Sequence, residues 1–399
     1  MRTLRAQKKC LGEAYMASGK GGGRIVALDL LRGLAVAGMI IVVSPGSWSQ
    51  VYAPLAHAPW HGWTPADLVF PTFLFCVGMA IGLSVPRLTP GDRASAGFWI
   101  KVARRTAMLI LLGLLLNALP KFDFAHLRLP GILQRIGLCY ALGVAICVLA
   151  APRAGSRLKF SFVAVTAAAV VLLAIYWALL AFAPVPGFGA GRLDSHGSLP
   201  AFIDRAVITI PHLWKHGTTE GVGVTYDPEG LLSTLPAAVN VLIGAIAAAL
   251  LARGGASRIA LALLSAALIA GGLLLDGVMP INKSIWTPSF ALLSSGLSMA
   301  ALFVLDLLAG LKPALKLAAP LTIFGGNAIL AFILSQLLGI FGSMPLLPGG
   351  HSAQGLTYDL ALRVIPDPKA ASLACALAVL AFILAILIPL HRRGIHLRL

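Results

Sequence analysis

The chain has 399 residues, of which 58% are hydrophobic and only 11% are charged, and its mean hydropathy is +0.90. A soluble domain carries about 25% charged residues, so this composition excludes an ordinary soluble fold. The formal net charge of +17 would suit a nucleic-acid-binding protein. In a membrane chain, however, such an excess is typical of basic inner loops, so we discard nucleic acid as a partner and expect an integral protein of the lipid bilayer.

Apolar runs of about 20 residues, long enough for a helix to cross the hydrocarbon layer, recur along the whole chain. The runs are continuous rather than alternating, which favours helices over a β-barrel. The sequence therefore predicts an all-α, polytopic bundle of about ten transmembrane helices, at 25–43, 64–84, 102–119, 131–150, 160–183, 231–251, 259–279, 286–308, 318–341 and 370–390.

Basic residues divide unequally between the segments that join these spans. With the amino end inside, the inner segments hold 21 Lys and Arg residues and the outer segments hold 8. This bias predicts that both termini are cytoplasmic. We expect a single transmembrane domain at 24–390, a basic cytoplasmic tail at 1–23 and a second one at 391–399, and large outer loops at 44–63, 184–230 and 342–369.

The first outer loop and the start of the span after it hold two histidines and a carboxylate close together in sequence. Thr64 and Pro65 are a good N-cap and first-turn pair, so we expect a helix to start there with Asp67 in its first turn. Asp67 then hydrogen-bonds a loop imidazole, that of His57 or His61, and fixes its tautomer, as a general base requires. The alternative from the residues alone is an interfacial belt of loop tryptophans with Asp67 as a simple helix cap.

Ionisable residues inside the spans are the next signal, because each is costly in lipid. Asp29 and Arg32 stand three residues apart on one face of the first span. They form either an ion pair that eases insertion or a site where Arg32 faces an anionic ligand. Gln134 and Arg135 lie near the outer end of the fourth span and indicate a polar pocket.

Two further outer segments are unusual in composition. Asp227 and Glu229 stand at the mouth of the sixth span, and Asn282 and Lys283 lie in a tight turn before the eighth. The two carboxylates suit a sugar amine or a cation; the alternatives are favourable charge at a helix N-terminus and an interfacial lysine. The outer-loop histidines match no metal-ligand spacing, so we expect no metal.

Five blocks, in order between residues 24 and 330, resemble the heparan-α-glucosaminide N-acetyltransferase family and its bacterial membrane relatives. The blocks are 24–33, 57–71, 128–135, 226–230 and 280–286, with a weaker likeness at 325–327. The likeness is greatest to the members encoded with bacterial N-acetylglucosamine-utilisation genes. That resemblance implies a protein of the bacterial inner membrane, and it suggests a homodimer.

The resemblance implies transfer of an acetyl group from cytosolic acetyl-CoA to the amine of a glucosamine-type sugar on the outer side. The catalytic histidine of the family falls on His57, with Asp67 as its partner. Contacts to the amino-sugar acceptor are expected from Trp60, His61, Asp227, Glu229, Asn282 and Lys283. In one departure, Val42-Val43-Ser44-Pro45 stands where family members tend to carry an asparagine, so an amide for the acetyl carbonyl is missing or replaced by Ser44.

The hydrocarbon layer is about 30 Å thick, longer than a pantetheine arm, so the donor must enter a cytoplasm-facing cavity. We expect Arg32, Arg104 and Arg105 to neutralise the phosphates of acetyl-CoA, with Gln134 and Arg135 as further contacts. Direct transfer in a ternary complex is the simpler scheme, and an acyl-imidazole on His57 is the other. Two alternatives remain from the sequence: a transporter of N-acetylglucosamine or a related amino sugar, and an acyltransferase that acts on a cell-envelope polymer.

Overall fold

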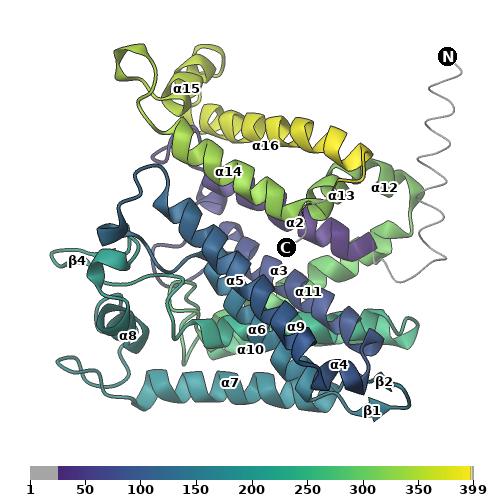
Figure 1. Ribbon diagram of the computed structural model, residues 1–399. Coiled ribbons are helices and arrows are strands. Elements are labelled where there is room, and N and C mark those ends of the chain that lie inside the picture. Colours follow the sequence, from purple (N-terminus) through teal and green to yellow (C-terminus); the bar gives the residue numbers. More distant parts are fainter. Residues whose placement is uncertain (1–25, 396, 398–399) are drawn as a thin grey trace, which may run out of the picture.

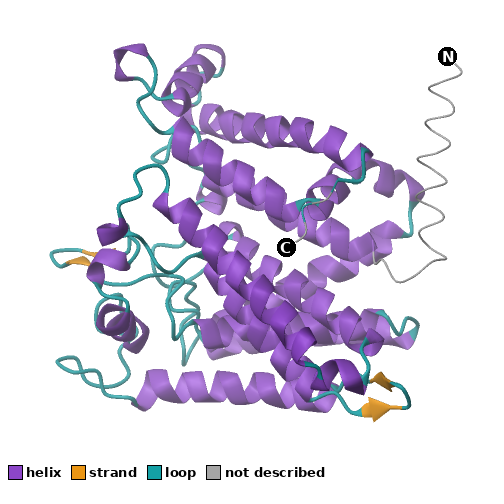
Figure 2. Cartoon of the chain, viewed as in Figure 1, coloured by secondary structure: helices purple, strands orange, loops and turns teal. Residues whose placement is uncertain are grey.

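The computed structural model describes residues 26–395 and 397, so the predicted basic tail at 1–23 lies outside the described residues. The described part is a helical bundle with two very short strand pairs (Figures 1 and 2). The strand pairs are β1 (Arg153–Ala154) with β2 (Arg157–Leu158), and β3 (Thr218–Thr219) with β4 (Gly223–Val224). The α-helices are α2 (Val26–Val43), α3 (Val69–Ser84), α4 (Pro90–Ala94), α5 (Ala96–Ala118), α6 (Ile132–Leu149), α7 (Phe162–Phe182), α8 (Leu199–Val207), α9 (Thr234–Leu251), α10 (Ala256–Leu275), α11 (Pro288–Ala309), α12 (Lys312–Leu317), α13 (Ala319–Gly326), α14 (Ala328–Gly342), α15 (Ala353–Val364) and α16 (Pro368–Arg392).

Eight helices of the described part are long and apolar enough to cross a membrane, which confirms a polytopic helical membrane protein. They are α2, α3 with its flanking turns, α6, α7, α9, α10, α11 and α16. The predicted span at 102–119 lies on α5, which is not among these eight helices. Helix α5 begins at Ala96 and carries Lys101, Arg104 and Arg105 in its first half.

The segment predicted as a span at 318–341 is sharply bent. The segment is two helices, α13 and α14, that meet at an angle of 86°. The break falls at Asn327, directly after Gly325 and Gly326, where the backbone leaves helical geometry. A carbonyl freed near such a break needs a partner in an apolar environment, and the carbonyl of Gly325 accepts a hydrogen bond from the Arg32 guanidinium.

The segments predicted as outer loops gather at one end of the bundle. Helix α8, the β3–β4 pair and α15 lie at the left in Figure 1, whereas α4, the β1–β2 pair and α12 lie at the right. The two long outer loops are therefore not fully irregular, since 184–230 contains α8 and the β3–β4 pair, and 342–369 contains α15. We call the left end the outer end and the right end the inner end.

Helix α9 is the buried centre of the bundle, and glycines set its distance from α3. A Cβ on Gly78 would lie 1.8 Å from the carbonyl oxygen of Val241, and one on Gly82 would lie 2.4 Å from that of Ala245. From the other side, a Cβ on Gly244 would lie 2.1 Å from the carbonyl oxygen of Phe75. The two backbones are thus in direct contact, as small residues permit in membrane bundles.

We predict that Gly78→Ala destabilises the protein, because a methyl group there meets the backbone of α9 and the two helices must separate. Overpacking of this kind costs about 1–3 kcal/mol. The measurement is the thermal midpoint of the detergent-solubilised protein, which should fall by several degrees. Gly339→Ala on α14 is the matched control, because a Cβ there meets nothing within 4 Å. Equal midpoints for both variants would contradict the proposed contact.

Candidate active site

The predicted helix start at Thr64 and Pro65 is present, and it buries Asp67. Residues Pro65–Leu68 form a 3-10 turn that leads into α3. Oxygen Oδ2 of Asp67 accepts hydrogen bonds from the backbone N–H of Ala58 (3.1 Å) and the backbone N–H of Thr64 (3.0 Å). The Thr64 hydroxyl lies 3.2 Å from the same oxygen and donates its one hydrogen to the carbonyl of Ala56 at 2.7 Å. The side chain of Asp67 is only 1% exposed. Two backbone donors therefore fix one oxygen of this carboxylate and leave the other for a different partner.

That partner is His57, as the sequence predicted for a loop imidazole. Nδ1 of His57 lies 2.7 Å from Oδ1 of Asp67. An ionised carboxylate only accepts hydrogen bonds, so Nδ1 carries the hydrogen and Nε2 of the neutral ring keeps its lone pair. The His57 side chain is 49% exposed. A buried carboxylate thus orients an accessible imidazole, which is the arrangement of a general base with its orienting group.

Lys283, which is distant in sequence, is the third member of this cluster. Its Nζ lies 3.3 Å from Oδ1 of Asp67, and 3.1 Å and 3.4 Å from Nδ1 and Nε2 of His57. Such similar distances to both ring nitrogens place the ammonium against the face of the imidazole. Burial lowers the pKa of Lys283, although the charges of Asp67 and Glu229 act in the opposite direction.

The loop that carries Lys283 is held on several sides. Asn282 accepts a hydrogen bond from the backbone N–H of Ile285 on its side-chain oxygen, and its own backbone N–H donates to the hydroxyl of Thr287. Trp286 is fully buried, has a positive φ of 52° and donates its indole N–H to Asn240. The carbonyl of Ile281 accepts from the backbone N–H of Gly62, so this loop and the first outer loop are joined directly.

Two of the predicted acceptor contacts, Trp60 and His61, lie beside the His57 cluster. The Trp60 indole N–H donates to the carbonyl of Leu193, and its ring packs edge-on against Tyr226 at 4.9 Å. Nδ1 of His61 lies 3.4 Å from the side-chain nitrogen of Asn282. These contacts tie the first outer loop to the 184–230 loop and to the 280–287 loop.

The other predicted pair, Asp227 and Glu229, binds an arginine that sequence reasoning did not single out. Arg128 donates to both oxygens of Asp227, at 2.7 and 2.9 Å, and to Glu229 at 2.5 Å. Burial would lower the pKa of Arg128, but Glu229 and Asp227 outweigh it and raise that pKa. Two carboxylates at a membrane edge need a cation, and Arg128 lies in one of the five blocks that resemble the family. These two features of the sequence indicated that a basic residue would pair with the carboxylates.

Gln134 and Arg135 are buried, but neither lines the cavity described below. The Gln134 amide donates to the carbonyl of Leu129. Arg135 donates to the carbonyl of Gly230 and to the hydroxyl of Ser233, and its guanidinium lies 5.1 Å from the centre of the Trp286 ring. Both side chains therefore act within the outer half of the bundle.

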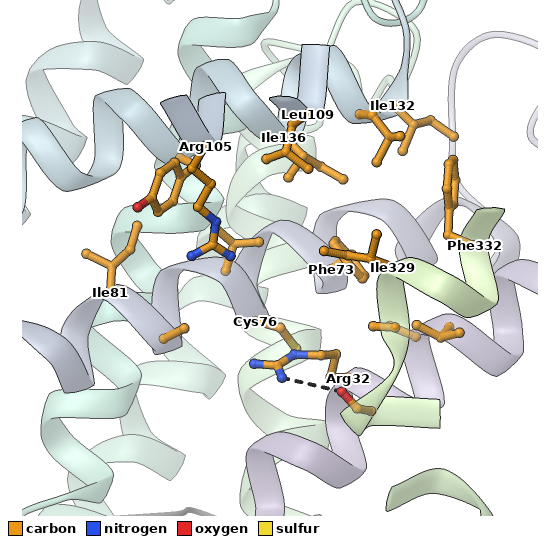
Figure 3. A pocket seen from close by; sticks show the side chains of 18 of the residues that line it. Arg32, Phe73, Cys76, Ile81, Arg105, Leu109, Ile132, Ile136, Ile329 and Phe332 are labelled. Atoms are coloured by element: carbon orange, nitrogen blue, oxygen red, sulfur yellow. Dashed lines mark hydrogen bonds between the residues drawn. The ribbon is translucent and has the colours of Figure 1, made fainter. Parts of the chain in front are cut away.

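A cavity of about 680 Å³ lies between α2, α3, α5, α6 and the α13–α14 pair (Figure 3). On α3 its lining runs from Val69 to Ser84, and on α6 it runs from Ile132 to Val148. At 1.5 Å per residue, the α3 wall alone is roughly 22 Å long, most of the thickness of a hydrocarbon layer. The outer limit of the cavity, at Val69, is two residues from Asp67 in sequence.

Two of the three predicted phosphate ligands line this cavity, and the third does not. Arg32 and Arg105 point into the cavity from α2 and α5 (Figure 3). Arg32 lies 3.8 Å from Asp29, so the predicted ion pair is present, and Arg105 stacks on Tyr140 at 4.6 Å. Arg104 is exposed and lies outside the lining. The cavity is otherwise mostly apolar.

Comparison with known proteins agrees with the resemblance seen in the sequence. The family model described as "Heparan-alpha-glucosaminide N-acetyltransferase, catalytic" matches residues 24–277. The chain belongs to this family. Heparan-alpha-glucosaminide N-acetyltransferase of Homo sapiens is 28% identical over 351 residues, 78% of this chain and 52% of the human protein. The Mus musculus protein of the same name is 28% identical over 356 residues, 79% of this chain and 54% of its own length.

The chain spans about half the length of these two N-acetyltransferases. The family match includes His57, Asp67 and four of the helices that line the cavity, α2, α3, α5 and α6. It ends at residue 277, before the loop that carries Lys283. The contacts of Lys283 with His57 and Asp67 therefore come from the structure and not from the family match.

One buried carboxylate of the outer end has a strongly shifted acidity. Asp204 on α8 is 1% exposed, and one of its oxygens accepts from the backbone N–H of Leu231 at 2.9 Å. Burial raises the pKa of Asp204 to about 7, and the nearby charge of Asp227 adds to the shift. The folded protein thus holds a proton on Asp204 that the unfolded chain releases at lower pH.

We predict that stability falls as the pH rises from about 4 to about 7, because over this range the unfolded state binds fewer protons at Asp204 than the folded state does. The effect is at most roughly 4 kcal/mol, at 1.36 kcal/mol per pH unit. Thermal midpoints between pH 5 and pH 7.5 measure it, and Asp204→Asn should flatten the fall. Asp123→Asn is the control, because its exposed carboxylate has a pKa that His126 lowers. A fall that persists unchanged in Asp204→Asn would refute this assignment.

Proposed function

We propose that this protein is a membrane acetyltransferase, which moves an acetyl group from acetyl-CoA to the amine of a glucosamine-type sugar at the outer end of the bundle. The observation that carries the proposal is the position of the His57–Asp67 pair relative to the cavity. An accessible His57, oriented by buried Asp67, stands just beyond one end of a long cavity. Membership of the N-acetyltransferase family supports the same reading.

The cavity suits the donor in shape and charge. Its length along α3, roughly 22 Å, lets a long arm extend from the inner half of the bundle toward His57. Arg32 and Arg105 supply two cations where phosphates would lie, and guanidinium groups bind phosphate oxygens well. The excess of basic residues in the predicted inner segments supports a cytoplasmic source for acetyl-CoA. We propose a bacterial inner membrane as its location, which the resemblance to bacterial members supports.

His57 acts as general base in this proposal. A glucosamine amine is largely protonated near neutral pH and must be free of that proton to attack a thioester. Nε2 of His57 carries the lone pair that takes a proton from the attacking nitrogen, while Asp67 holds the ring in that tautomer. We propose direct transfer, because both substrates reach His57 from opposite ends and a ternary complex needs no covalent step on the enzyme.

His57→Ala should lower the rate of acetyl transfer about 10²- to 10⁴-fold while acetyl-CoA still binds, because only the base is lost. The measurement uses purified protein in liposomes with labelled acetyl-CoA and glucosamine. His126→Ala is the matched control and should retain most of the activity, because that exposed imidazole pairs with Asp123 and not with the His57 cluster. Equal product from wild type and His57→Ala would show that another residue is the general base. If wild type forms no acetylated product but carries labelled amino sugar across the liposome membrane, the protein is a transporter and the proposal fails.

Arg32→Gln and Arg105→Gln should each raise the KM for acetyl-CoA about 10- to 100-fold with little change in kcat. Each loses a hydrogen bond to a charged group, worth about 1.5–3 kcal/mol. Arg104→Gln is a close control, since it is adjacent in sequence and lies outside the cavity lining. The same KM change in all three variants would show a general charge effect, and no change in any would place the donor outside this cavity.

A further inference from the structure

Among the residues that the structure describes, Lys283 is the one charged group in direct contact with both members of the His57–Asp67 pair. Its side chain is 18% exposed, and its Nζ lies 3.3 Å from Asp67 and 3.4 Å from Nε2 of His57. Nε2 is where the attacking amine must give up its proton under the proposed function. The ammonium therefore stands beside the place where the new bond would form.

The hydrogen atoms of Lys283 are not all engaged. An ammonium has three donors. One points to Oδ1 of Asp67, whereas Nδ1 of His57 cannot accept, because it carries the hydrogen that goes to Asp67. The lone pair of Nε2 lies in the plane of the ring, and the ammonium lies against the face. Within the described part of the chain, at least one N–H of Lys283 therefore has no acceptor and can serve a ligand above the imidazole.

Two polar side chains of the first outer loop and the helix start after it have already committed their hydrogens. The Trp60 indole donates to the carbonyl of Leu193, and the Thr64 hydroxyl donates to the carbonyl of Ala56. Ser44, the candidate replacement for the asparagine typical of the family, follows α2, and its buried hydroxyl has no hydrogen-bond partner among the described residues. Lys283, unlike Ser44, contacts both His57 and Asp67.

The position of Lys283 is fixed by the fold. Asn282 beside it is fully buried and bonded through both its side chain and its backbone, and Trp286 anchors the other side of the loop. A preorganised donor is the kind that stabilises developing charge at little cost of reorganisation. This rigidity separates Lys283 from a flexible surface lysine.

We propose that the ammonium of Lys283 is an electrophilic catalyst that hydrogen-bonds the carbonyl oxygen of the donor thioester. The proposal rests on the acetyltransferase function above. As the amine nitrogen forms its bond to the carbonyl carbon, the C=O π pair moves to oxygen, and Lys283 stabilises that oxyanion. Nε2 of His57 takes the proton from nitrogen. The oxyanion then re-forms C=O, the C–S bond breaks with its electron pair on sulfur, and the imidazolium proton passes to the thiolate. The products are the amide and free CoA.

This assignment changes the predicted role of one residue. Lys283 was expected to contact the acceptor sugar, and here it contacts the acetyl group of the donor. Its lowered pKa fits this role, because a more acidic ammonium is a stronger hydrogen-bond donor.

The test compares Lys283→Met, Lys283→Arg and wild type in the liposome assay. Lys283→Met should lower kcat about 10²- to 10³-fold, the loss seen when one oxyanion donor is removed, with the KM for acetyl-CoA changed less than about threefold. Lys283→Arg, which keeps the charge and the donors, should recover about tenfold of that loss. Lys121→Met, at an exposed outer-loop lysine, is the control and should behave as wild type. Should Lys283→Met fail to fold, as judged by its thermal midpoint, Lys283→Gln replaces it.

A second measurement separates catalysis from mere positioning of His57. Chloroacetyl-CoA has a more electrophilic carbonyl and needs less stabilisation of its oxyanion, so the loss in Lys283→Met should shrink at least severalfold with this donor. Equal losses with both donors would reduce Lys283 to a positioning residue and overturn the proposal.

A third measurement requires no turnover. A methylphosphonothioate ester of CoA carries an anionic tetrahedral oxygen in place of the carbonyl. Wild type should bind it more tightly than acetyl-CoA in a thermal-shift titration, and Lys283→Met should lose that preference. An active wild type with unchanged kcat in Lys283→Met would overturn this proposal alone, whereas a wild type without any acetyl transfer would overturn the proposed function as well.

Discussion

The buried carboxylate of Asp67 is the constraint on which the outer end of the bundle depends. An unpaired charge at 1% exposure would be too costly to keep, so every neighbouring segment contributes a donor. The helix start gives the backbone N–H of Thr64, the first outer loop gives Ala58 and His57, and the 280–287 loop gives Lys283. Satisfying this carboxylate joins the first outer loop and the start of α3 to a loop that is distant in sequence, and the assembled group has the chemistry of a base with a nearby cation.

The sequence was sufficient where the physical signal is local. Transmembrane helices follow from runs of apolar residues, and the turn that buries Asp67 follows from Thr64 and Pro65 at its start. The pairing of Asp67 with His57 could be expected for the same reason, because ten residues of loop return the imidazole to the helix start. The Asp29–Arg32 ion pair is another short-range feature of this kind.

What the sequence could not supply depends on contacts between distant segments. Gln134 and Arg135 lie on a helix that lines the cavity, but the direction of their side chains is decided by Leu129, Gly230 and Trp286. Hydropathy likewise identifies 318–341 as one apolar segment. It gives no sign of the 86° bend, because a bend does not alter the mean hydropathy of a segment. The partner of Asp227 lies 99 residues away in sequence, so the two carboxylates indicate that a cation is needed but do not show which of the distant basic residues supplies it.

The glycine contacts between α3 and α9 also restrict how a donor enters. Helix α3 forms one wall of the cavity and continues from the turn that holds Asp67, and its backbone touches that of α9 at Gly78 and Gly82. A wall in backbone contact with the buried centre of the bundle cannot shift sideways without breaking that contact. The same criterion joins two further walls, because a Cβ on Gly33 of α2 would lie 1.9 Å from the carbonyl oxygen of Leu321 on α13. The turn that holds Asp67 therefore continues from a wall that is fixed at van der Waals distance from α9.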